Sequence, residues 1–234
     1  MLRIGRVTLI IFLLLLPFSA FGQQSYIGRF DAYAGFMYLE SPHVSLGEPG
    51  FHTQVGVRVK PWYSLGFDYS VGAGDTSLTP GLFTTSLQQQ LGTELGQLAA
   101  LGLIPANYTL SLPIHSRTQT FAAGPQLAFH HWSLVTLYLR PSIGAIHETA
   151  IPHPADPIAA MIVQQLAPSG KKVDWTPFYG VGGGADFNVS THFAVRAQLD
   201  VVHDHLFSDL LKDGRNSIRF SIGPAFQFGR NVVQ

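Results

Sequence analysis

The stretch Phe51-His-Thr-Gln-Val-Gly-Val-Arg-Val59 places Phe, Thr and Val in one series, and His, Gln, Gly and Arg in the other. The following stretch, from Tyr63 to Val71, repeats this two-residue alternation. Because successive side chains of a β-strand point to opposite faces, each stretch has one apolar face and one polar face. Strands of about ten residues with this pattern, separated by turn residues, are typical of transmembrane β-barrels.

Eight segments carry the alternation and predict an all-β fold. Three connections between them are very short, and the other four, at residues 40–50, 74–116, 149–173 and 204–215, are longer. Short and long connections alternate strictly, as do the periplasmic turns and extracellular loops of outer-membrane barrels. The sequence therefore predicts an eight-stranded antiparallel up-and-down transmembrane β-barrel. The predicted strands are Arg29–Leu39, Phe51–Lys60, Trp62–Ala73, Arg117–His130, Leu134–Glu148, Asp174–Val189, His192–His203 and Asn216–Phe228.

The apolar series is expected to face lipid. In the seventh strand it runs from Phe193 through Val195 and Leu199 to Val201 without a charge. A charge on this face near the bilayer midplane would cost about 2–4 kcal/mol. Aromatic residues near both ends of the series predict the two girdles that flank a lipid-facing band. The alternative is a soluble β-sandwich or a lipocalin-like barrel with the two faces exchanged.

The opposite series carries charges of both signs and predicts an ion-pair network inside the barrel, because buried charges need partners. Eight strands enclose a lumen that side chains can just fill, so a wide pore is not expected. Arg29 and Asp31 of the first strand are expected to join this network. Its predicted members are Arg58, Lys60, Asp68, Arg140, Glu148, Asp186, Arg196, Asp200 and Arg219.

Residues 1–22 are predicted to be a secretory signal peptide, which leaves 23–234 as the barrel domain. Arg3 and Arg6 precede an apolar run, and small residues at positions 20 and 22 fit a cleavage site. An uncleaved membrane anchor is the alternative, but the run is shorter than the roughly 20 residues of a spanning helix. Without residues 1–22 the chain keeps 12 basic and 14 acidic residues and no cysteine. This composition excludes disulfide and thiolate chemistry and gives no basis for nucleic-acid binding.

Two of the long connections contain helical patterns. Leucines at helical spacing lie within Phe83–Leu103, and apolar residues at the same spacing lie within Ile158–Leu166. Asp156 and Pro157 are typical of a helix start. The sequence therefore predicts short helices in the extracellular loops. They either fold against the barrel mouth, or form a lid or a surface that binds a partner.

The sequence His203-Asp204-His205, followed by Ser208 and Asp209, is the one constellation with potential chemistry. Two histidines at alternate strand positions can reach one metal ion, and a histidine near an aspartate and a serine can activate a hydroxyl group. His203, His205 and Ser208 are therefore the candidate catalytic residues. The third ligand of a metal site is not identifiable, and an ordinary polar rim explains the same residues. No metal or other cofactor is predicted.

The closing segment from Ser217 to Phe228, together with the signal peptide and the eight amphipathic strands, resembles the OmpA-like eight-stranded outer-membrane β-barrel proteins. The resemblance covers essentially the whole chain after residue 22 and is one of architecture. It implies insertion among outer-membrane lipids by an assembly machinery that reads the C-terminal strand.

The predicted role is therefore that of a monomeric, non-enzymatic structural or surface-interaction protein, with a possible partner at loops 74–116 and 149–173. A narrow channel or carrier for small or lipophilic solutes is the first alternative. An enzyme that modifies outer-membrane lipids is the second, because some eight-stranded barrels are lipid A acyltransferases or deacylases.

Overall fold

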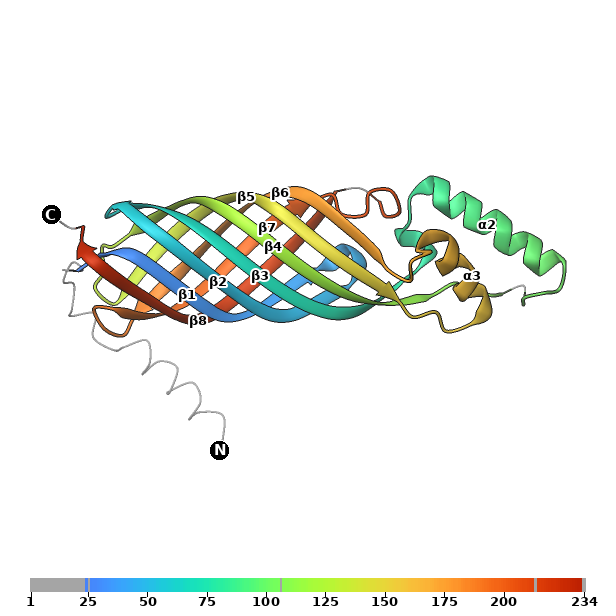
Figure 1. Cartoon of the computed structure of the whole chain (residues 1–234), viewed down its shortest axis with the longest axis horizontal. Coiled ribbons are helices and arrows are strands. Elements are labelled where there is room, and N and C mark those ends of the chain that lie inside the picture. The colour runs from blue at the N-terminus through green and yellow to red at the C-terminus, as the bar shows by residue number, and fades with distance from the viewer. Residues whose placement is uncertain (1–23, 25, 106, 213, 233–234) are drawn as a thin grey trace, which may run out of the picture.

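The computed structural model describes residues 24, 26–105, 107–212 and 214–232; the predicted signal peptide lies outside them. Eight antiparallel strands pair in chain order, and the first strand also pairs with the last, so the sheet closes into a barrel (Figure 1). This architecture confirms the predicted fold. The strands are β1 (Gly28–Ser41), β2 (Leu46–Lys60), β3 (Tyr63–Leu78), β4 (Leu112–Phe129), β5 (Val135–Pro152), β6 (Lys172–Asn188), β7 (Phe193–Asp204) and β8 (Arg215–Asn231).

The first predicted loop, residues 40–50, is wrong. β1 and β2 continue through most of it and are joined by the single 3-10 turn η1 (Pro42–Val44). Ser45 closes this turn in the left-handed region, at φ 50°. The inward series continues without interruption, because Leu46 and Glu48 are both buried inside the barrel. The strands of β4 and β5 also run further than predicted, so the barrel is longer at this end.

Both helices of the prediction are present. After the 3-10 turn η2 (Pro80–Leu82), α2 covers Thr85–Ala100, and α3 covers Pro157–Leu166. The two helices lie at the same end of the barrel, which we call the loop end (Figure 1). β1 begins and β8 ends at the opposite end, which we call the turn end (Figure 1). Among the described residues, no helix is long and apolar enough to cross a bilayer.

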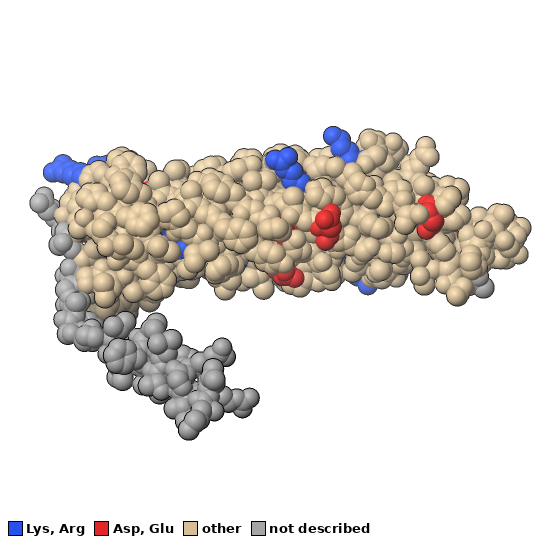
Figure 2. Space-filling model, turned by 90° about the horizontal axis from the view of Figure 1, so that it is seen from below, with Lys and Arg blue, Asp and Glu red and all other residues tan. Residues whose placement is uncertain are grey.

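The outward face of the barrel carries the predicted aromatic girdles. Phe129 and Phe228 are exposed near the turn end, and Phe51 and Trp175 near the loop end. Among the described residues, no Asp, Glu, Lys or Arg lies on the outward face between the girdles. One outward position of the fourth predicted strand departs from the expected pattern, because Arg117 is exposed just beyond the loop-end girdle. Figure 2 shows a largely charge-free surface that separates the basic turn end from mixed charges toward the loop end.

The apolar band makes a testable prediction. Val55 faces outward near the middle of the band and is 55% exposed. Replacing it by arginine (Val55→Arg) should lower the free energy of unfolding in lipid vesicles by about 2–4 kcal/mol, because the charge would face hydrocarbon. The control Ser77→Arg introduces the same charge at an exposed position at the loop end and should have little effect. Equal effects of the two substitutions would contradict the placement of the band.

Candidate functional site

The inward side chains form three polar layers, which we name by position as the turn-end, central and loop-end layers. In the turn-end layer, Arg196 donates two hydrogen bonds to the carboxylate of Asp186, at 2.7 and 2.8 Å, and a third to Asp31 at 3.3 Å. Its guanidinium carbon lies 5.1 Å from the ring centroid of Tyr138. Arg58 donates to the Gln227 side chain at 3.0 Å. All of these charges are buried, and for Arg196 and Asp186 the paired geometry offsets the cost of removing them from water.

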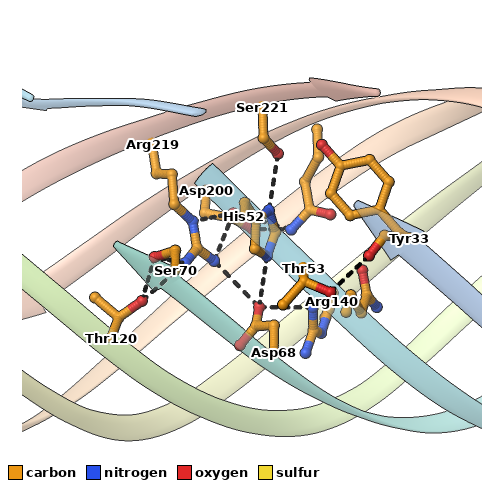
Figure 3. A network of polar contacts seen from close by, with 12 residues as sticks. Tyr33, His52, Thr53, Asp68, Ser70, Thr120, Arg140, Asp200, Arg219 and Ser221 are labelled. Atoms are coloured by element: carbon orange, nitrogen blue, oxygen red, sulfur yellow. Dashed lines mark hydrogen bonds and ion pairs between the residues drawn. The ribbon is translucent and has the colours of Figure 1, made fainter. Parts of the chain in front are cut away.

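The central layer is organised by Asp68 (Figure 3). One oxygen of its carboxylate, Oδ2, accepts hydrogen bonds from Arg140 at 2.8 Å and from Arg219 at 3.2 Å, and lies 3.3 Å from Nε2 of His52. Arg219 also donates to Asp200 at 2.9 Å. These residues come from five different strands, so the layer ties opposite walls of the barrel together and fills its centre.

The loop-end layer lies beneath the barrel mouth and combines Glu48, Glu148, Asp204 and Arg215. Arg215 donates to Glu148 at 3.0 Å and to Asp204 at 3.3 Å. Glu48 receives a hydrogen bond only on Oε1, from Thr118 at 3.0 Å. Sequence reasoning assigned Glu48, Asp204 and Arg215 to loops and missed three of the four members. The continued alternation through residues 46–50 was the signal that could have found Glu48.

Charge is balanced differently in the three layers. The turn-end and central layers each contain two carboxylates and two guanidinium groups, whereas the loop-end layer contains three carboxylates and one guanidinium group. Within the described part of the chain, Oε2 of Glu48 and Oδ2 of Asp204 are buried and have no hydrogen-bond partner. Among the described residues, the loop-end layer therefore has more carboxyl than guanidinium groups, whereas the other two layers have equal numbers.

Two predicted members of the lumen network are not in the lumen. Lys60 is exposed, and its ammonium lies 5.8 Å from the ring centroid of Trp62. The pairing of β2 with β3 shifts register between Arg58 and Lys60, which turns Lys60 out of the inward series. Arg29 is also exposed, next to a register shift in the pairing of β1 with β8. The other predicted members are buried in the three layers.

An apolar cap closes the loop end above these layers. We define the cap as residues 80–100 with η2 and α2, residues 157–166 with α3, and residues 205–212 of the last connection. Leu91 of α2 and Ile162 of α3 are buried in one hydrophobic cluster with Phe83 and Phe207. Backbone hydrogen bonds from Thr84 to Leu210 and from Lys212 to Leu82, at 2.9 and 3.1 Å, join the second loop to the fourth.

A small apolar cavity of about 60 Å³ lies between the cap and the barrel strands, lined among others by Phe83, Val163 and Phe207. A cavity that binds benzene measures about 150 Å³, so this cavity is too small for a ligand of that size without movement of the cap. Residues of both helices share one hydrophobic cluster with inward residues of the barrel, such as Ile146 and Phe178.

The structure places the members of the His203 cluster in different surroundings. Asp204 points into the barrel and binds Arg215, whereas His203 lies on the other face of β7 and contacts Asn216 at 2.8 Å. The rings of His203 and His205 are 5.0 Å apart, and Ser208 is exposed. Within the described ranges, no three His, Cys, Asp or Glu side chains are arranged to hold a metal ion. The alternation of the strand itself separates Asp204 from the histidines on either side of it.

The unequal charge balance predicts opposite effects for two similar substitutions. Asp68→Asn removes the charge that Arg140 and Arg219 share, and should lower the free energy of unfolding by about 3–5 kcal/mol, because it leaves buried cations uncompensated. Glu48→Gln removes one of three carboxyl groups that share a single guanidinium group and keeps an oxygen for Thr118, and should leave stability unchanged or raise it. The unfolding midpoint in vesicles distinguishes the two, and a large loss in Glu48→Gln would contradict the charge balance.

The N-terminus of α3 predicts a dependence on pH. Asp156 accepts hydrogen bonds from the backbone N–H groups of Ala159 and Ile158, at 2.8 and 2.9 Å, and one from the Tyr108 hydroxyl. The bond from Ala159 is the largest of the causes that lower the pKa of Asp156. Burial and this carboxylate raise the pKa of Tyr108 to about 12, so its hydroxyl stays protonated at neutral pH.

Because the pKa of Asp156 is lower in the folded state, its stabilisation is complete above its unfolded pKa of about 4 and is lost as pH falls through the folded value. Amide hydrogen exchange in α3, corrected for the intrinsic rate, should therefore increase below about pH 4. Asp156→Ala should show fast exchange already at pH 7 and no acid step. An acid step that persists in this variant would assign the titration to another group.

No protein-family model matches the sequence, and no curated protein matches it either. The fold, however, is similar to that of Neisserial surface protein A, with a TM-score of 0.51 and 12% identity over 85% of this chain and 96% of that chain. OprG from Pseudomonas aeruginosa gives a TM-score of 0.47 and 9% identity over 89% and 99% of the two chains. Ail, the attachment invasion locus protein of Yersinia pestis, gives 0.46 and 12% over 85% and 96%. The chain therefore has the fold of the small eight-stranded outer-membrane β-barrels, as its resemblance to the OmpA-like proteins predicted.

Proposed function

We propose that the protein is a monomeric outer-membrane barrel that acts through the cap and loops at its loop end, in a structural or surface-interaction role. The proposal takes the apolar band between the aromatic girdles as the membrane-spanning zone. The turn end then faces the periplasm and the loop end faces the outside of the cell, and the assembly machinery reads the C-terminal strand β8. The signal peptide at residues 1–22 supplies the export step.

The filled lumen is the observation that carries this proposal. Arg196 and Arg219 are at most 2% exposed, in layers of ion pairs that span the barrel from wall to wall. The cap covers the loop end with a hydrophobic cluster. A solute would have to break buried ion pairs to pass, and each such break costs several kcal/mol. The barrel thus serves as an anchor, and the loops are the parts left free to make contacts.

The second loop offers the surface best suited to a partner. α2 extends beyond the barrel mouth (Figure 1), and Leu101 and Leu103 at its far end are 73% and 65% exposed. These two exposed leucines are the apolar feature of this loop that supports contact with a partner. Of loops 74–116 and 149–173, we therefore expect the tip of α2 to be the main contact site for a partner.

A carrier of lipophilic solutes is the second candidate, and the apolar cavity under the cap is the observation that favours it. Its volume of about 60 Å³ and the polar layers below it argue against transport through the lumen. A lipid-modifying enzyme is the third. His203 and Asp204 lie on opposite faces of β7, which argues against a shared reaction. His203→Ala with Ser208→Ala should leave the lipid A profile of the host unchanged.

Electrical recording tests the closed barrel directly. The purified protein, inserted into planar bilayers, should give flat current traces, while a gel of the same sample should show the heat-modifiable band of a folded barrel. The double variant Asp68→Asn with Asp200→Asn, which removes both carboxylates of the central layer, should increase leakage if the layer seals the lumen. Steady, resolved conductance of the native protein would contradict the anchor role and indicate a channel.

A further inference from the structure

A polar groove lies on the outward face of β4 and β5, just beyond the loop-end side of the charge-free band. It has a volume of about 390 Å³ and lies outside the lumen, the cap and the His203 cluster. In the sheet, Arg117 pairs with Thr149, and Gln119 pairs with His147. The groove is lined by His115, Arg117, Gln119, His147, Thr149 and Ile151.

The loop-end aromatic girdle borders this groove on the side toward the turn end. The rings of Tyr69 and Phe121 are 5.1 Å apart, those of Phe121 and Trp175 are 6.0 Å apart, and Trp175 contacts His147 at 4.4 Å. Aromatic girdles mark the boundary between hydrocarbon and headgroups. A side chain directly beyond the girdle, such as Arg117, therefore lies at the depth of the lipid headgroups.

The groove contains donors without protein partners. Arg117 is exposed and has no hydrogen bond or ion pair with any described residue. Nδ1 of His147 is buried and likewise lacks a hydrogen-bond partner in the described part of the chain. His115 differs, because its Nδ1 lies 2.8 Å from a carboxylate oxygen of Asp75. Asp75 thus satisfies His115, whereas Arg117 remains an uncompensated cation at the membrane interface.

We propose that this groove binds the phosphate of a lipid headgroup, with Arg117 as the main donor. The planar guanidinium group matches the geometry of phosphate oxygens and can donate two parallel hydrogen bonds. Gln119 and Thr149 supply neutral donors on either side, and the acyl chains of the lipid lie against the aromatic girdle below. The inference rests on the proposed membrane placement and adds a specific lipid site to it.

The position favours a membrane lipid over a free anion in solution. A cation at the surface of an anionic membrane gains about 1 kcal/mol, whereas a single exposed arginine in water binds free phosphate weakly. At the depth of the aromatic girdle, a headgroup is held at high local concentration by its own chains.

Fluorescence quenching by brominated lipids provides the test, because the chain has three tryptophans and one of them, Trp175, borders the groove. In the background Trp62→Phe with Trp132→Phe, Trp175 is the only tryptophan. Phosphatidic acid with brominated chains, in vesicles of phosphatidylcholine, should quench Trp175 at lower mole fraction than brominated phosphatidylcholine does. Arg117→Gln should reduce this preference about fivefold, which corresponds to about 1 kcal/mol.

The matched control is Lys60→Gln, which removes an exposed cation at the turn end and should leave the preference intact. Equal quenching by the two lipids in the native background, or an unchanged preference in Arg117→Gln, would overturn the proposal. Competition by inorganic phosphate that abolishes the preference would assign the groove to a soluble anion instead. Each sample is also run unheated on a gel, because loss of the heat-modifiable band would count against membrane placement rather than against the groove.

Discussion

The carboxylate of Asp68, shared between Arg140 and Arg219, is the interaction on which the centre of the barrel depends. Three strands contribute these groups, and Asp200 and His52 extend the contacts to two more. A lumen enclosed by eight strands has little room for water, so each charge in it needs a partner at the same level of the barrel. Backbone hydrogen bonds join only adjacent strands of the barrel. These ion pairs also connect strands that are not adjacent, across the lumen. The paired side chains therefore fill the centre of the lumen.

The loop end follows from a different constraint. Beyond the layer of Glu48 and Glu148 the inward series becomes apolar, and the loops supply the matching surface from above. Hydrophobic burial then orders loops that are too long to be set by turn geometry alone. Hydrophobic burial is non-directional, so it does not fix how the loops are oriented. Hydrogen bonds between the second and fourth loops, and between Tyr108 and Asp156, define that orientation.

The outer surface separates two kinds of contact. Between the girdles its described side chains are almost all apolar and none is charged, which suits hydrocarbon without regard to lipid identity. At the loop-end girdle, Arg117 and its neighbours interrupt this uniform surface. Beyond them, the tip of α2 carries exposed leucines away from the bilayer. An apolar band, a polar groove and a projecting loop thus follow one another along the barrel axis.

The sequence by itself determined which face of each strand is apolar, because the period of two is a local property that needs no knowledge of neighbours. It also determined both loop helices, whose leucine spacing and Asp156 cap are equally local. It did not determine which inward charges meet: Asp68 and Arg219 are 151 positions apart, and only strand stagger around the closed barrel brings them to one level. Register shifts turned Lys60 and Arg29 outward, and the turn at residues 42–45 extended two strands through an expected loop. These features depend on hydrogen bonds between strands, so only the tertiary structure decided them.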